Sequence, residues 1–117
     1  MSLPENDPRT RRAEERLEEI RRRVAALDYV CSGTLQRRTK VCGKPSCACA
    51  RDPAARHGPY YEWSHREGGH TVYSVLPASL GPLLARAVRN YHRLRRLLRR
   101  WERESVRVLK ARSEHNH

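Results

Sequence analysis

Three of the four cysteines in this chain, Cys42, Cys47 and Cys49, lie close together in the sequence, and His57 follows them. Thiolate sulfurs and an imidazole nitrogen, four in all, form the ligand set typical of a structural zinc ion. The residues 43–45, Gly-Lys-Pro, predict a tight turn that brings the first two thiols together. In an extended Cys47-Ala48-Cys49 segment both thiols point to the same side. The spacing therefore predicts zinc bound by Cys42, Cys47, Cys49 and His57.

Other interpretations of these residues remain open. Cys31, which precedes the cluster, is an alternative fourth ligand, and His65 and His70 are weaker candidates. A disulfide is disfavoured in a reducing compartment, and a bridge within Cys-x-Cys would be strained. Crowded free thiols would oxidise readily. A metal site is therefore the preferred hypothesis, although this spacing is not that of a standard zinc finger.

The elements that must position this site differ along the chain. Residues 8–29 are predicted to form a helix, because the apolar residues recur at spacings of 3 and 4: Ala13, Leu17, Ile20, Val24 and Leu27. Residues 33–77 are predicted to form a zinc-stabilised β region. Tyr61, Trp63 and His65 alternate before a Gly68-Gly69 turn, and Thr71, Tyr73 and Val75 alternate after it. This pattern predicts an antiparallel hairpin.

A long helix is predicted over residues 79–112. Its apolar positions alternate at spacings of 4 and 3, as in a coiled-coil seam, and run through Leu80, Leu84, Ala87, Tyr91, Leu94, Leu98, Trp101, Ser105 and Val108. The expected fold is α+β, with an N-terminal helix, a small zinc-stabilised antiparallel sheet and a long basic C-terminal helix, the two helices packed as a coiled-coil hairpin. Because the first helix is too short to cover the second, we expect a homodimer.

The 117 residues are expected to form a single domain, with residues 1–7 and 113–117 disordered. No apolar run reaches the roughly 18 residues of a membrane span. The N-terminal residues show no secretory signal pattern. These observations predict a cytoplasmic protein without a membrane partner.

The formal net charge is +12, and it is concentrated near the C-terminus. Residues 78–112 carry eleven basic and two acidic side chains, whereas residues 1–29 carry seven of each. A concentrated positive field attracts polyanions, nucleic acid above all. The residues expected to bind nucleic acid are Arg37, Arg38, Lys40 and Lys44 near the cysteines, and Arg86, Arg89, Arg93, Arg96, Arg99, Arg100, Arg103 and Arg107 on the long helix.

Three stretches carry a family resemblance: CGKPSCACA, HGPYYEW and GGHTVYSVLP, followed by an arginine-rich helix with Asn90-Tyr91-His92-Arg93-Leu94. They resemble a family of small uncharacterised bacterial proteins with a CGKPxCxCA…HGPY…GGK pattern, often encoded near transposase or recombinase genes. The resemblance covers about residues 33–100. It includes Cys42, Cys47, Cys49 and His57 but not Cys31, and His70 replaces the expected lysine. It implies an accessory protein of a mobile element.

These observations lead to the hypothesis of a nucleic-acid-binding accessory protein, more for DNA than for RNA, with a structural Zn²⁺ ion. Such a protein would assist a transposase or recombinase in transposition or recombination. The alternative is a zinc-stabilised coiled-coil module that binds a protein partner and no nucleic acid. Enzyme activity is not expected, because four protein ligands leave zinc no open position and no oriented base accompanies a nucleophile.

Overall fold

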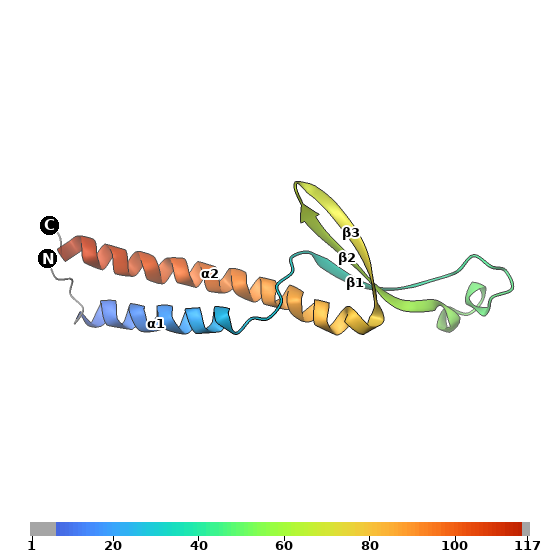
Figure 1. Ribbon diagram of the computed structural model, residues 1–117, viewed down its shortest axis with the longest axis horizontal. Coiled ribbons are helices and arrows are strands. Elements are labelled where there is room, and N and C mark those ends of the chain that lie inside the picture. The colour runs from blue at the N-terminus through green and yellow to red at the C-terminus, as the bar shows by residue number, and fades with distance from the viewer. Residues whose placement is uncertain (1–6, 116–117) are drawn as a thin grey trace. The chain divides into compact units, whose positions relative to one another are not determined.

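The computed structural model describes residues 7–115, so the predictions of disorder for residues 1–6 and 116–117 lie outside the described residues. The order of elements confirms an α+β protein (Figure 1). The elements are α1 (Pro8–Ala25), β1 (Thr34–Lys40), β2 (His57–Glu67), β3 (His70–Pro77) and α2 (Gly81–His115), with short 3-10 turns at Ala48–Ala50, Pro53–Ala55 and Ala78–Leu80.

The chain forms two compact units, which do not test the prediction of a single domain. The helical unit contains the residues up to 28 and from 91 onward, and the sheet unit contains residues 29–90. Helix α2 contributes residues to both units.

Helix α1 begins and ends for identifiable reasons. The Asp7 carboxylate caps it by accepting a hydrogen bond from the Arg9 backbone N–H at 2.9 Å. The helix ends at Ala25, four residues before the predicted end. The chain beyond it bonds instead to α2: the Cys31 N–H donates to the Ala87 carbonyl at 3.1 Å. The buried Asn90 side chain donates to the Tyr29 carbonyl at 2.9 Å. These long-range bonds favour an extended path over further helix.

The two helices of the helical unit run antiparallel. Arg9 lies 3.6 Å from Glu114, and Arg16 lies 2.9 Å from Glu104. A later position in α1 therefore meets an earlier position in α2. The buried core between them contains Ala13, Leu17 and Val108, with Trp101 packed against it. Glu104, itself buried, also accepts from Arg107 at 2.6 Å. Buried apolar contacts and a paired carboxylate therefore hold this unit together.

The predicted coiled-coil seam is wrong at two of its positions, Leu80, which is 43 % exposed, and Leu98. Leu98 is 51 % exposed, whereas its neighbour Leu97 is 3 % exposed. A strict repeat of 3.5 residues per turn drifts by about 20° per heptad from a straight helix of 3.6 residues per turn. The buried face therefore moves onto Leu97, Glu104 and Ala111. The helix also continues to His115, so residues 113–115 are helical and not disordered as predicted.

The sheet unit contains three antiparallel strands in the order β1-β2-β3. The predicted hairpin is confirmed, with Glu67 opposite His70 and both turn glycines at positive φ. One face of the sheet is anchored: the Trp63 indole N–H donates to the Ser32 carbonyl at 2.8 Å. A Cβ atom on Gly81 would overlap the Tyr61 ring, so the start of α2 lies directly against this face.

No helix among residues 7–115 is long and apolar enough to cross a membrane.

Candidate metal centre and basic surface

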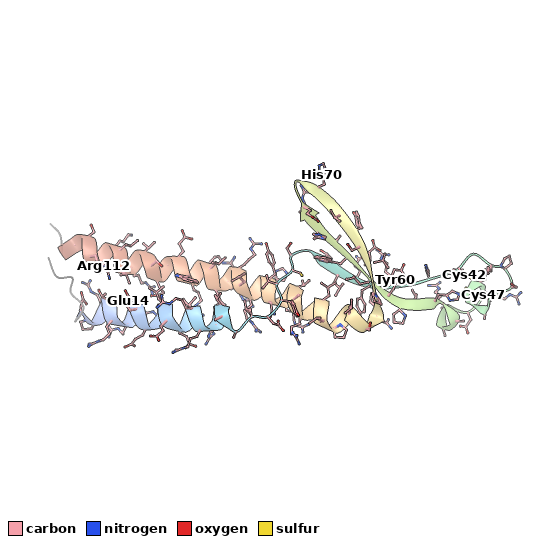
Figure 2. All side chains as sticks on the ribbon, in the orientation of Figure 1. Glu14, Cys42, Cys47, Tyr60, His70 and Arg112 are labelled. Carbon is pink, nitrogen blue, oxygen red and sulfur yellow. The ribbon has the colours of Figure 1, made fainter. Side chains whose placement is uncertain are left out.

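The loop between β1 and β2 brings together Cys42, Cys47, Cys49 and His57. One ligand atom from each lies within 4.8 Å of all the others. A short 3-10 turn, Ala48–Ala50, turns the chain back on itself, and β2 begins at His57. Figure 2 shows Cys42 and Cys47 close together in this loop, away from His70 at the tip of the hairpin. The four side chains could hold one metal ion.

The distances within the cluster suit a four-coordinate ion. The sulfurs of Cys42 and Cys49 are 3.5 Å apart, and the Cys47 sulfur lies 3.4 Å from His57 Nε2. With bonds of about 2.3 Å to sulfur and 2.0 Å to nitrogen, the edges of a tetrahedral site measure about 3.5–3.8 Å. The observed separations are therefore close to those of a tetrahedral site.

Hydrogen bonds and burial shift the pKa values of the three thiols in different directions. A hydrogen bond from the Lys44 backbone lowers the pKa of Cys42, with a further contribution from Cys49. A hydrogen bond from the Cys49 backbone lowers the pKa of Cys47. The Cys42 backbone N–H, 3.4 Å from the Cys49 sulfur, lowers the pKa of Cys49, but burial and the neighbouring sulfurs outweigh it and leave that pKa raised. The loop thus favours the thiolate form, which binds metal, at two of its three cysteines.

The alternative ligands lie elsewhere in the structure. The cluster of four excludes Cys31, whose backbone bonds to α2. His65 stacks on Trp63 with ring centroids 3.9 Å apart and lies 3.0 Å from Glu67. His70 is at the exposed end of the hairpin. Among the described side chains, therefore, the fourth potential ligand beside the three clustered cysteines is His57.

The profile of a domain of unknown function, DUF6788, matches residues 10–86, about two thirds of the chain. The chain belongs to the DUF6788 family. The matched range contains the whole metal loop and the sheet of this DUF6788 protein, and it ends in the second turn of α2. No curated protein and no solved structure matches the chain.

The basic residues near the metal loop lie on both faces of β1 and in the loop that follows it. Arg37 and Arg38 point to opposite faces of β1, as successive residues of a strand do. Arg38 pairs with Glu62 at 2.8 Å, and the Lys40 ammonium lies 5.8 Å from the centre of the Tyr60 ring. Lys44 is exposed in the loop between β1 and β2.

The arginines of α2 are more regularly spaced. Within the helical unit they repeat at spacings of 3 and 4 along one stripe, and we call these residues the basic stripe: Arg93, Arg96, Arg100, Arg103, Arg107 and Lys110. The same spacing extends back to Arg89 and Arg86, whereas Arg99 lies beside it. Of the six, Arg107 alone forms an ion pair with another described residue. The stripe is about 25 Å long by the rise of a helix.

Helix α1 adds basic residues that sequence analysis missed. Arg9, Arg12 and Arg16 line a groove of about 360 Å³ together with Arg107, Lys110, Ala111 and Glu114 of α2. Their spacing of 3 and 4 residues, which places them on one flank of α1, was the available signal. The charge balance of residues 1–29 concealed it, because acidic residues elsewhere on α1 cancel the sum.

Proposed function

We propose that Cys42, Cys47, Cys49 and His57 bind a zinc ion with a structural role. A set of three thiolates and one imidazole is typical of closed structural zinc sites. Such a site would join the end of β1 to the start of β2, because Cys42 follows the first strand and His57 begins the second. The free energy of zinc binding would stabilise this loop, in which Cys49 is the one buried side chain.

We further propose that this DUF6788 protein binds nucleic acid through the basic stripe. The observation that carries the proposal is that six cationic side chains share one flank of α2 and five of them lack a carboxylate partner among the described residues. Unpaired arginines at regular spacing suit a chain of phosphates, to which guanidinium groups bind through paired hydrogen bonds. Arg9 and Arg12 would extend the contact across the groove to α1.

DNA is the nucleic acid that we propose first. The resemblance to proteins encoded beside transposase or recombinase genes favours DNA over RNA, and it makes such an enzyme the protein partner to test. Contacts to phosphates carry no sequence information, so binding through the stripe is expected to tolerate many sequences.

Fluorescence anisotropy with duplex DNA at several salt concentrations tests this proposal. The variant Arg93→Gln/Arg96→Gln/Arg103→Gln removes three stripe residues that form no ion pair with another described residue. Each lost phosphate contact lowers the slope of log K against log salt by about 0.9, so the slope is expected to fall by about three.

The matched control removes the same charge from other positions, in Arg11→Gln/Arg21→Gln/Arg95→Gln. The control is expected to keep most of the salt slope. An equal loss in both variants would show that net charge, and not the stripe, determines binding. A wild-type protein that fails to bind duplex DNA, single strands and RNA at low salt would contradict the proposal.

A second copy of the chain suits the other flank of α2. Leu98 and Leu109 are exposed there and lie off the basic stripe. Contact between two such flanks would bury apolar surface and leave both stripes open to an anionic ligand. The predicted homodimer is therefore proposed here, and light scattering of the purified protein measures it.

A further inference from the structure

The two faces of the sheet differ in their environment. The face with Tyr61 and Trp63 packs against the start of α2 and the Ser32 backbone. The opposite face, which we call the open face, has no such cover within the sheet unit. On it Tyr73 is 68 % exposed and Val75 is 69 % exposed, although large aromatic and branched side chains are usually at least half buried in a sheet.

The strand register defines which side chains share the open face. Tyr60 lies between Arg38 on β1 and Pro77 on β3, and Ser64 lies opposite Tyr73. Because Ser64 is four residues from Tyr60, the two tyrosines are offset by about 13 Å along the strands. Two flat aromatic rings therefore lie on one surface, far enough apart to contact separate groups.

Cations accompany these rings. Lys40 lies over Tyr60, Arg38 is held beside it through Glu62, and Arg66 extends from β2 near the hairpin turn. Three cations and a single carboxylate give the open face an excess of positive charge. Exposed rings with cations beside them suit a ligand that has both flat apolar surfaces and negative charges.

Resting on the nucleic-acid binding proposed above, we propose that the open face binds unpaired bases of a single strand. Tyr73 stacks on one base, Val75 contacts its edge, Arg66 binds a neighbouring phosphate, and Lys40 binds a phosphate further along the same strand. Every base has a flat face, so stacking of this kind is tolerant of sequence. In a duplex the faces of the bases are covered by their neighbours and only the edges are accessible in the grooves. The open face therefore selects single-stranded over double-stranded nucleic acid.

Anisotropy titrations with labelled oligothymidylate and with duplex DNA of equal length test the proposal. Tyr73→Ala is expected to weaken binding of oligothymidylate about ten-fold, as loss of one stacked base does. Its binding to duplex DNA is expected to change less than two-fold. Tyr73→Phe keeps the ring and is expected to bind as the wild type does. Thr71→Ala, on the same face of the same strand, is the matched control and is expected to have no effect.

The outcomes separate this proposal from the one on which it rests. If Tyr73→Ala and wild type bind oligothymidylate equally, or if the wild type binds duplex DNA alone, the open face does not stack bases, although binding through the basic stripe stands. If the wild type binds neither of these ligands nor RNA, both proposals are wrong. Thermal melting of each variant, with Tyr73→Phe as reference, checks that the exposed position leaves the fold intact.

Discussion

The helical unit and the sheet unit are each stabilised by different interactions. In the helical unit Ala13, Leu17 and Val108 form a shared core, and the buried Glu104 carboxylate is paired from both helices. In the sheet unit the strands contain no residue that is fully buried, and the cysteine loop buries Cys49 alone. The first unit resembles a small helical protein stabilised by packing. The second relies on strand hydrogen bonds, a few specific contacts and, as we propose, a metal ion.

The difference shows why so polar a chain can fold. Apolar residues spaced for a helix are sufficient to pack two helices, whereas a three-stranded sheet with one open face buries little apolar surface. A metal ion compensates for a missing core by linking segments directly. The open face can then remain exposed for the binding that we propose.

Loss of the metal is the change expected to affect the stabilities of the two units most differently. Cys47→Ser, or a chelator added to the wild type, should unfold the metal loop and destabilise the sheet unit, because zinc binding contributes on the order of 10 kcal/mol in small zinc domains. The helical unit should keep its helix content. Elemental analysis measures the metal and far-ultraviolet circular dichroism the helix content. The near-ultraviolet signal of the two tryptophans, Trp63 in the sheet unit and Trp101 in the helical unit, measures the loss of packing.

Cys31→Ser is the control for the loss of metal and should keep about one zinc per chain, since Cys31 is outside the cluster. A wild-type protein that contains no metal and melts identically with and without chelator would rule out the site.

A core substitution should have the reverse effect. Leu17→Ala removes a buried side chain from the helical unit and should lower the free energy of unfolding of that unit by about 3 kcal/mol. Leu98→Ala removes the same atoms from an exposed position and should change it by less than about 0.5 kcal/mol. Chemical denaturation measures both. Equal costs for the two variants would contradict the assignment of Leu97, and not Leu98, to the buried face.

A backbone position should give the smallest effect. Gly33 has φ of +110°, and a Cβ atom there would overlap the Ser64 carbonyl oxygen of β2. Gly69 also has a positive φ, but a Cβ atom on it would contact nothing within 4 Å. Gly33→Ala should therefore destabilise the sheet unit by about 2 kcal/mol more than Gly69→Ala. Hydrogen exchange of the strand amides measures the difference, and similar protection in the two variants would contradict it.

Residue types and local spacing were sufficient to predict much of this structure. The proximity of the metal-loop residues follows from ligand chemistry, and the hairpin follows from Gly68-Gly69 between alternating residues. Both signals are contained within a few residues, so they do not depend on the rest of the fold.

Features set by distant contacts could not be predicted in the same way. The end of α1 depends on bonds from Cys31 and Tyr29 to α2, and the buried partner Asn90 lies 61 residues from Tyr29. The shift from Leu98 to Leu97 depends on how a straight helix accumulates a small rotation over several turns. The arginines of α1 belong to the proposed binding surface because α1 shares a groove with α2, a contact that local spacing does not reveal.

Because the basic stripe repeats every seven residues, α2 could be lengthened by one heptad with little disturbance of the stripe. Inserting seven residues would lengthen the helix by about 10.5 Å and turn the side chains beyond the insertion by only about 20°. Inserting one residue would turn them by about 100° and move the cations off their flank. A change in the length of α2 by whole heptads therefore keeps the arginines on one flank, whereas a change by a single residue does not.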